Sequence, residues 1–197
     1  MVARNDDARI FPMPTKREAT VEDLYRFQGD GKAELVNGEL VVMSPSGGLH
    51  GRAVLEIAVS LHDYERRTKR GYAFGDSVGF LVHSAHRRSF SPDAAFYVGP
   101  PSGPRFLEGA PVFAVEVRSP EDYGPVAERA MAAKRADYFA AGTLVVWDVD
   151  VIRDKWIHVH RATDPENPTI YRPGEIAEAE PALPGWTFPV ADLFVTA

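Results

Sequence analysis

The chain has 197 residues, of which 45% are apolar and 25% charged, with a formal net charge of −6 at pH 7 and no cysteine. This composition is typical of a globular domain; the lack of cysteine excludes disulfides and thiolate metal sites and leaves carboxylates, histidines and carbonyls as metal ligands. Because no apolar run approaches the roughly 20 residues of a membrane helix and no secretory pattern is visible, we expect a cytoplasmic protein without a membrane partner.

The N-terminal segment mixes charges and prolines without periodicity, which predicts a flexible arm over residues 1–19. The rest, residues 20–197, fits a single domain, because its length suffices for one hydrophobic core and no repeat divides it. Thr20 followed by Glu22 and Asp23 is typical of a helix start, with a capping hydroxyl and acids in the first turn.

A hairpin and a long helix are expected next. Asn37-Gly38 stands between two apolar runs, the strongest short-range signal for a tight turn, so we expect strands near 33–36 and 39–43. A Ser-Pro-Gly break follows, and a helix is expected from about His50 to Arg67. Its buried face would consist of apolar residues at helical spacing, namely Val54, Ile57, Ala58, Leu61 and Tyr64.

The remaining segments alternate between strands and one further helix. Strands are expected over 72–83, 91–98, 112–119, 143–150 and 156–162, and a helix over 123–141 that Gly142 ends. The run 112–119 is almost wholly apolar, as in a central strand buried on both faces, whereas 156–162 alternates as an outer strand does. The tail from Pro181 onward holds several large apolar residues, so we expect it to pack back as a short strand or lid.

Two acids lie in segments that otherwise resemble buried strands. Glu116 is the single acid of 112–119, where an unpaired carboxylate is costly to bury, and Asp93 stands in the preceding strand. If these strands are neighbours, both carboxylates can reach one point at the sheet edge and, with the backbone carbonyl of Val117, hold Mg²⁺ or Mn²⁺. The alternative is structural: Asp93 caps a turn after Pro92, and Glu116 pairs with an arginine.

A stripe of small and apolar residues in the second long helix carries one lysine. The members of the stripe are Ala127, Met131, Lys134, Tyr138 and Ala141. Such a stripe faces a sheet, so Lys134 would point inward, where it could orient the attacking water or stabilise charge on a phosphate, with Tyr138 as an accessory residue. The alternative is a snorkelling lysine that forms a salt bridge with Glu116.

Two further residues are candidates for the same site. Glu34 lies in the first hairpin strand beside two apolar residues, and it could hold a water on the metal or a second metal. An ordinary edge-strand acid is a nearly equal alternative. His50 opens the long helix and could contact a phosphate as an accessory residue, although a lone histidine at a helix start is more often a capping or packing residue.

Basic and histidine-containing segments give weaker signals. A local basic face could bind DNA phosphates even in an acidic chain, although basic clusters are more often solvated surface. The two clusters are Arg66, Arg67, Lys69 and Arg70 after the first long helix, and His86, Arg87 and Arg88 before the second acid strand. His158 and His160 alternate on a strand without an acid at matching spacing, so a zinc site is weakly indicated.

The ordered motifs resemble a known family. ELVNGELVVMSP, His50 at a helix start, SPDAAF, AVEVRSP, and then Lys134 with Tyr138, Gly142 and VVWDVD are similar, in this order, to the Uma-two family of putative restriction endonucleases, within the PD-(D/E)XK nuclease superfamily. The similarity covers about residues 20–194. It implies an α/β (α+β) fold, a restriction-endonuclease-like mixed β-sheet flanked by helices with an N-terminal β-hairpin.

The resemblance also implies roles for individual residues. Pro92-Asp93 stands for the PD pair, Glu116 for the second acid, and Glu34 for the family's acid before the hairpin turn. The superfamily lysine is expected two residues after the second acid, where this chain has Arg118, which could stabilise charge but cannot serve as a base. The resemblance implies that Lys134 takes the lysine role.

The expected activity is hydrolysis of DNA phosphodiester bonds by a Mg²⁺- or Mn²⁺-dependent endonuclease, and by analogy with enzymes that cut both strands it could be a homodimer. A catalytically silent module of the same fold, which binds DNA or a protein, is the second hypothesis, favoured by the acidic net charge and by Arg118. A metal-dependent hydrolase of another substrate is the third. Missing G-x-S-x-G, Walker and G-x-G-x-x-G motifs disfavour α/β-hydrolases, nucleotidases and dehydrogenases.

Overall fold

The protein is described by a computed structural model over residues 17–29, 31–84 and 86–194, so the arm predicted over 1–19 lies almost wholly outside the described residues. A six-stranded sheet forms the centre, in the order β11-β10-β9-β8-β6-β3. Its strands are β3 (Tyr72–Phe74), β6 (Ala94–Tyr97), β8 (Phe113–Val117), β9 (Val145–Asp150), β10 (Trp156–Arg161) and β11 (Asp164–Tyr171). The pair β8–β9 is parallel and the others are antiparallel, so the predicted mixed sheet is confirmed.

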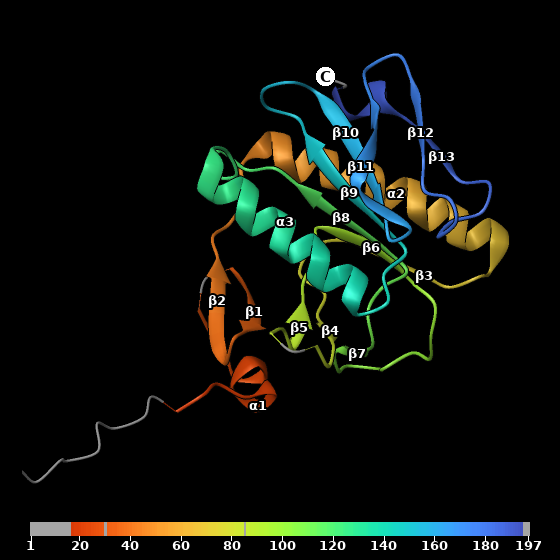
Figure 1. Cartoon of the computed structure of the whole chain (residues 1–197). Helices are drawn as coiled ribbons and strands as arrows, with labels where there is room; N and C mark the ends of the chain where they lie inside the picture. The colour runs from red at the N-terminus through yellow and green to blue at the C-terminus, as the bar shows by residue number, and fades with distance from the viewer. Residues whose placement is uncertain (1–16, 30, 85, 195–197) are drawn as a thin grey trace, which may run out of the picture.

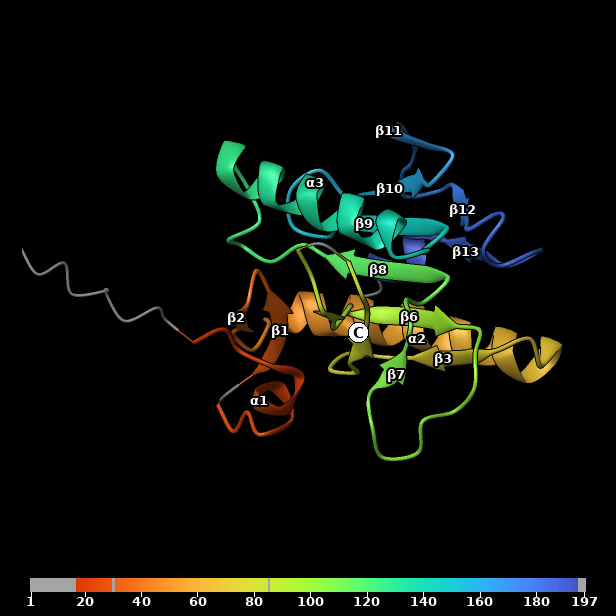
Figure 2. The same cartoon turned by 60° about the horizontal axis from the view of Figure 1, so that its bottom comes forward.

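Two long helices cover the two faces of this sheet. Figure 2 shows α2 (Gly48–Thr68) on one face and α3 (Pro125–Ala140) on the other. The larger apolar cluster lies between α2 and the sheet, and a smaller cluster that includes Tyr138 lies on the α3 side. None of the helices in the described ranges has the length and apolarity needed to cross a membrane.

The N-terminal hairpin stands at one end of the main sheet (Figures 1 and 2). Strands β1 (Lys32–Val36) and β2 (Glu39–Met43) pair antiparallel around a turn in which Asn37 and Gly38 have φ angles of 49° and 71°. Positive φ at both positions is what a type I′ turn requires, which explains why Asn-Gly predicted it. The short helix α1 (Val21–Tyr25) precedes the hairpin, with Thr20 in a capping box.

The segment 72–83, predicted as a strand, is two strands in two different sheets. The chain turns at Asp76 and Ser77, where Ser77 has a φ of 67°, so β3 ends before the turn and β4 (Phe80–Leu81) begins after it. Strand β4 pairs with β5 (Ser89–Phe90) and β7 (Leu107–Glu108), two short strands that the sequence analysis did not predict.

The expectation that 156–162 is an outer strand is wrong, because β10 lies between β9 and β11. The edge strand beside β10 is β11, which contains two prolines and mostly exposed polar residues, a pattern typical of a loop. Proline is tolerated at a sheet edge, where its missing N–H can face solvent.

The C-terminal tail packs back onto the molecule, as its apolar residues predicted. Strand β13 (Thr187–Pro189) pairs with β12 (Ile176–Glu178), and a 3₁₀ turn, η1 (Val190–Phe194), follows. Trp186 is buried in the larger cluster, with its ring centroid 5.0 Å from that of Trp147 on β9. The tail therefore completes the core on the α2 side and leaves the hairpin end of the sheet open.

Candidate active site at the hairpin end of the sheet

A cavity of about 720 Å³ opens where the hairpin, the start of α2, the end of β8 and α3 meet. The sequence analysis named eight site residues, and all eight line this cavity: Glu34, His50, Asp93, Glu116, Val117, Arg118, Lys134 and Tyr138. They come from five separate parts of the chain, so the fold brings distant motifs to one place. What each side chain contacts there decides which chemistry it can perform.

Asp93 lies just before β6 and is buried, with a side-chain exposure of 7%. Its Oδ1 accepts a hydrogen bond of 2.6 Å from Lys32 Nζ, and its Oδ2 lies 2.8 Å from the Val117 backbone N–H and 3.2 Å from Nε2 of His50. Burial alone would raise the pKa of Asp93, but the hydrogen bond from His50 and the charge of Lys32 outweigh it and hold the pKa well below its usual range. Asp93 is therefore a carboxylate at neutral pH, and it does not cap a turn.

Glu116 lies in β8 and contacts two residues of α3. Lys134 Nζ is 2.8 Å from its Oε1, and the Tyr138 hydroxyl donates a hydrogen bond of 2.6 Å to the same oxygen. Burial raises the pKa of Glu116, and the negative charges of Asp93 and Glu34 raise it further against the opposing charge of Lys134. The partner of Glu116 is therefore a lysine, not the arginine of the structural alternative.

Lys134 binds Glu34 as well, at 3.0 Å, so its ammonium group bridges two carboxylates. Burial would lower the pKa of Lys134, but the charges of Glu116 and Glu34 outweigh burial and raise it. All five members of the predicted stripe on α3 are buried or half-buried, which confirms that this helix face turns inward. The salt bridge between Lys134 and Glu116 that the structural alternative predicted is therefore present. The catalytic role predicted for Lys134 would place its ammonium group at the same position.

Glu34 is no ordinary edge-strand acid, because its side chain is only 4% exposed. It accepts a backbone hydrogen bond of 2.8 Å from Ser91 and an ion pair from Arg87, whose Nε also donates to Asp137 at 3.0 Å. Arg87 is itself buried and forms ion pairs with Glu34 and Asp137, so it does not belong to an exposed basic surface. Arg87 instead ties the hairpin strand to α3.

The two acids have different neighbours in the cavity. Asp93 contacts His50 of α2, whereas Glu116 contacts α3, and these helices lie on opposite faces (Figure 2). Strand β1 joins the two halves, because Lys32 binds Asp93 and Glu34, two residues later on the same strand face, binds the partner of Glu116. The hairpin therefore contacts residues on both sides of the cavity, through Lys32 and through Glu34.

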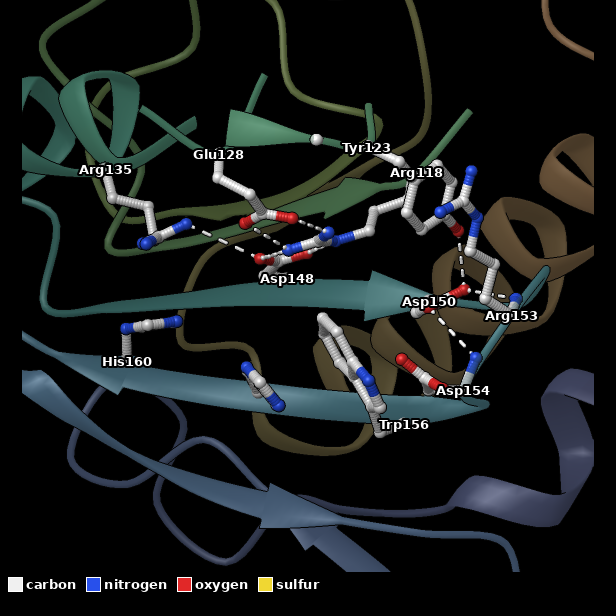
Figure 3. A pocket seen from close by; sticks show the side chains of 12 residues that line it. Arg118, Tyr123, Glu128, Arg135, Asp148, Asp150, Arg153, Asp154, Trp156 and His160 are labelled. Carbon is white, nitrogen blue, oxygen red and sulfur yellow. Dashed lines mark hydrogen bonds and ion pairs between the residues drawn. The ribbon is translucent and has the colours of Figure 1, made fainter. Parts of the chain in front are cut away.

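Arg118 lines the cavity, but its guanidinium group is bound elsewhere, as Figure 3 shows. Asp148 accepts two hydrogen bonds of 2.8 Å from it, Glu128 accepts two more, and the group lies 4.8 Å from the centre of the Trp156 ring. With both edges of the guanidinium engaged, Arg118 joins β8, β9 and α3. It has no free edge for a phosphate in this arrangement.

Sequence reasoning missed Lys32 and Asp76. Lys32 opens β1 and binds Asp93, and Asp76, in the turn after β3, accepts a second hydrogen bond of 2.7 Å from the same ammonium group. One signal for Lys32 was available, since a residue two positions before Glu34 on a strand shares its face. Asp76 had no such signal, because its role depends on the turn that splits 72–83.

The remaining candidates lie away from this cavity. Arg66, Arg67, Lys69 and Arg70 are exposed at the far end of α2 from His50. His158 and His160 line a second cavity of about 440 Å³, where burial lowers the pKa of His158 to about 4. Within the described ranges no cluster of three or more His, Asp, Glu or Cys side chains could hold a metal ion, so no zinc site forms at these histidines.

The donor set suits a hard divalent cation. Asp93 and Glu116 would supply carboxylate oxygens, and Val117, the residue after Glu116, lines the same cavity and would supply its backbone carbonyl. Mg²⁺ commonly uses one or two carboxylates, keeps several waters and takes further oxygens from a substrate phosphate. Two acids and a carbonyl beside an open cavity match this coordination of Mg²⁺, whereas zinc prefers nitrogen or sulfur ligands.

Comparisons with known proteins agree with this architecture. Residues 19–191 match the model of the Uma2 family, described as "Putative restriction endonuclease". Among solved structures, a "putative nuclease belonging to DUF820" from Anabaena variabilis superposes with a TM-score of 0.70 at 16% identity, over 89% of this chain and 97% of that chain. At this identity the likeness shows a shared fold. No curated protein matches the chain.

Proposed function

The chain belongs to the Uma2 family, and from this membership and the cavity we propose that it is a metal-dependent DNA endonuclease that hydrolyses phosphodiester bonds. The observation that carries the proposal is the convergence of Asp93, Glu116, Lys134 and Glu34 at one cavity, although they lie on separate elements. Two buried acids, Glu34 and Asp93, and a largely buried acid and lysine, Glu116 and Lys134, are costly to keep unless they serve a site.

Asp93, Glu116 and the Val117 carbonyl would hold Mg²⁺ or Mn²⁺. A divalent cation there supplies Lewis-acid polarisation of the phosphate and a lower pKa for an attacking water. The Val117 N–H holds the Asp93 carboxylate in place, and the Tyr138 hydroxyl does the same for Glu116. Both acids thus have fixed orientations before any ligand arrives.

Lys134 would act through its charge. Because its pKa is raised, the ammonium group keeps its proton at neutral pH and cannot serve as a general base. It can donate a hydrogen bond to the attacking water and stabilise negative charge on the phosphate, while Glu34 orients it from the other side. Arg118, which is held by Asp148 and Glu128, is assigned a structural role.

Plasmid nicking tests the proposal. Supercoiled DNA is incubated with the protein and Mg²⁺ or Mn²⁺, and the same reaction is run with Asp93→Asn and Glu116→Gln. Asp63→Asn, an exposed acid of α2, is the matched control. The wild type and the control should nick the plasmid only with metal, and the two site variants should lose the activity by roughly a hundredfold or more. Equal nicking by wild type and site variants would overturn the proposal.

A silent module is the second candidate, and one observation favours it. Lys32, Lys134 and Arg87 together give each of the three acids a cationic partner without a metal. Such a protein would bind DNA or another protein without cutting. It predicts no rise in unfolding temperature with Mn²⁺, whereas a metal site raises the temperature through binding to the folded state.

We further propose that a second copy of the chain is needed to cut both strands of a duplex, because the cavity offers one set of acids for one phosphodiester at a time. A monomeric enzyme would release nicked circles before linear DNA, and a dimer would produce linear DNA in one encounter. Light scattering on the active protein separates the two.

A further inference from the structure

Lys32 shares its ammonium group between two carboxylates of very different exposure. Its Nζ lies 2.6 Å from Asp93 and 2.7 Å from Asp76. The Asp93 side chain is 7% exposed, whereas that of Asp76 is 42% exposed, and Lys32 itself is 15% exposed. Lys32 therefore has one partner inside the site and one at the surface.

The inner contact of Lys32 uses the oxygen that a metal would need. Asp93 Oδ2 already accepts the Val117 N–H and lies beside His50, so Oδ1 is the oxygen left for a cation. Lys32 binds that Oδ1. An ammonium group and a divalent cation on one carboxylate repel each other, and in a half-buried site water screens that repulsion poorly.

We propose that Lys32 sets the metal affinity of the site: its ammonium group takes the place of the cation on Asp93 in the metal-free protein, and Asp76 receives it when a divalent cation binds. The inference rests on the metal site of the proposed function. Lys32 remains paired with Asp76 after the exchange, so the protein does not leave a buried ammonium group without a counter-charge.

Lys134 does not have this property. Its two partners, Glu34 and Glu116, both belong to the site, and both are largely buried. If Lys134 left one of them it would still lie against the other, so it stays in the site as a fixed charge. Two lysines line the cavity. Among the described residues, Lys32 alone of these two has a carboxylate partner outside the site, namely Asp76.

Mn²⁺ binding to the full-length protein, measured by titration calorimetry without DNA, tests the proposal. Lys32→Met removes the competing charge and should lower the dissociation constant at least about fivefold, the lower end of usual coupling between two ligands. Lys32→Arg keeps the charge and should not tighten binding. Lys69→Met, which removes an exposed lysine at the far end of α2, should leave the constant unchanged.

Asp76→Asn tests whether Asp76 receives the Lys32 ammonium group when the metal binds. The amide oxygen of the variant can still accept the hydrogen bond from the Ser77 N–H. Without the outer carboxylate, Lys32 binds Asp93 alone, so Mn²⁺ affinity should fall severalfold in this variant. In a Lys32→Met background the same substitution should have no effect, because there is no ammonium group to receive. If the negative charge of Asp76 attracted the metal directly, Asp76→Asn would lower Mn²⁺ affinity equally in the wild type and in the Lys32→Met variant.

Two results would overturn the inference: unchanged or weaker Mn²⁺ binding by a folded Lys32→Met variant, or an equal effect of Asp76→Asn with and without Lys32. If Lys32→Met does not fold, Asp76→Asn alone still tests the proposal, because the Asp76 side chain is 42% exposed and unchanged Mn²⁺ affinity in this variant would overturn the exchange. A protein that binds Mn²⁺ with the predicted pattern but cuts no DNA would refute the nuclease proposal and leave this one standing. Absence of Mn²⁺ binding in wild type and Lys32→Met would refute both.

Discussion

The backbone N–H of Val117 donates a hydrogen bond of 2.8 Å to Oδ2 of Asp93. This single bond fixes the carboxylate of one segment to the end of the neighbouring strand, one residue after Glu116. Asp93 contacts His50 of α2, Glu116 contacts Lys134 of α3, and both acids line one cavity. The geometry of the site therefore depends on strand pairing. The pKa of Asp93 is lowered and that of Glu116 is raised, so substituting the two acids should change the free energy of unfolding in opposite directions.

Asp93→Asn should lower the free energy of unfolding of the metal-free protein at pH 7. The folded-state pKa of Asp93 lies below its unfolded value near 4, so its stabilising contribution is full above about pH 4 and is lost as pH falls through the folded-state value. Urea unfolding in EDTA at several pH values measures this. The difference in the free energy of unfolding between variant and wild type should shrink as pH falls from about 4 to about 2. A difference that stays constant over this range would contradict the prediction.

Glu116→Gln should have the opposite effect on the free energy of unfolding of the metal-free protein at pH 7. The folded-state pKa of Glu116 is raised, so its stabilising contribution exists only below the unfolded value and is lost as pH rises through the folded value, and the ionised side chain costs stability at pH 7. The amide keeps an acceptor for the Tyr138 hydroxyl. In EDTA at pH 7 the variant should unfold at the same or a higher temperature than wild type. A clearly lower midpoint would show that the carboxylate stabilises the fold.

Lys134→Met should reduce the rate of metal-dependent DNA cleavage by roughly a hundredfold, because one charge that stabilises the transition state is removed. The variant also leaves Glu34 and Glu116 without their shared counter-charge, so its metal-free form should be less stable. Lys134→Arg keeps the charge and should retain part of the activity. Single-turnover rates with saturating Mn²⁺ separate the chemistry from folding; an unimpaired Met variant would exclude Lys134 from the reaction.

Arg87→Met should destabilise the protein by about 3–5 kcal/mol, because it leaves the buried Glu34 and its neighbour Asp137 without their arginine. Arg88→Met, the exposed neighbour, is the matched control and should change stability by less than about 0.5 kcal/mol. Denaturant unfolding measures both. If Arg87→Met were as stable as the control and lost only DNA affinity, the residue would be a phosphate contact after all.

Much of the central architecture followed from local patterns. Asn37-Gly38 needs positive φ at both positions, and the apolar run around Glu116 suits a strand covered on both faces, so each pattern had one physical solution. Strand β11 did not follow, because its prolines are acceptable only at an edge, and which strand is the edge is decided by tertiary pairing. The same applies to the turn at Asp76.

The site was predictable where a residue type conflicted with its surroundings. Glu116 and Lys134 stood out as charges among apolar residues, which burial makes costly. Lys32 and Arg87 did not stand out, because a lysine at a strand start and an arginine in a basic cluster are ordinary on a surface. Their burial arises only when the hairpin closes the cavity, a long-range contact that no local sequence pattern encodes.

The central claim is that Asp93, Glu116 and the Val117 carbonyl coordinate one divalent cation. Anomalous scattering from a crystal soaked in Mn²⁺ tests it directly. We expect a manganese peak within about 2.0–2.6 Å of oxygens from both carboxylates and the Val117 carbonyl, with the Lys32 ammonium group withdrawn from Asp93. A peak at another site, or none in the cavity at saturating Mn²⁺, would contradict it.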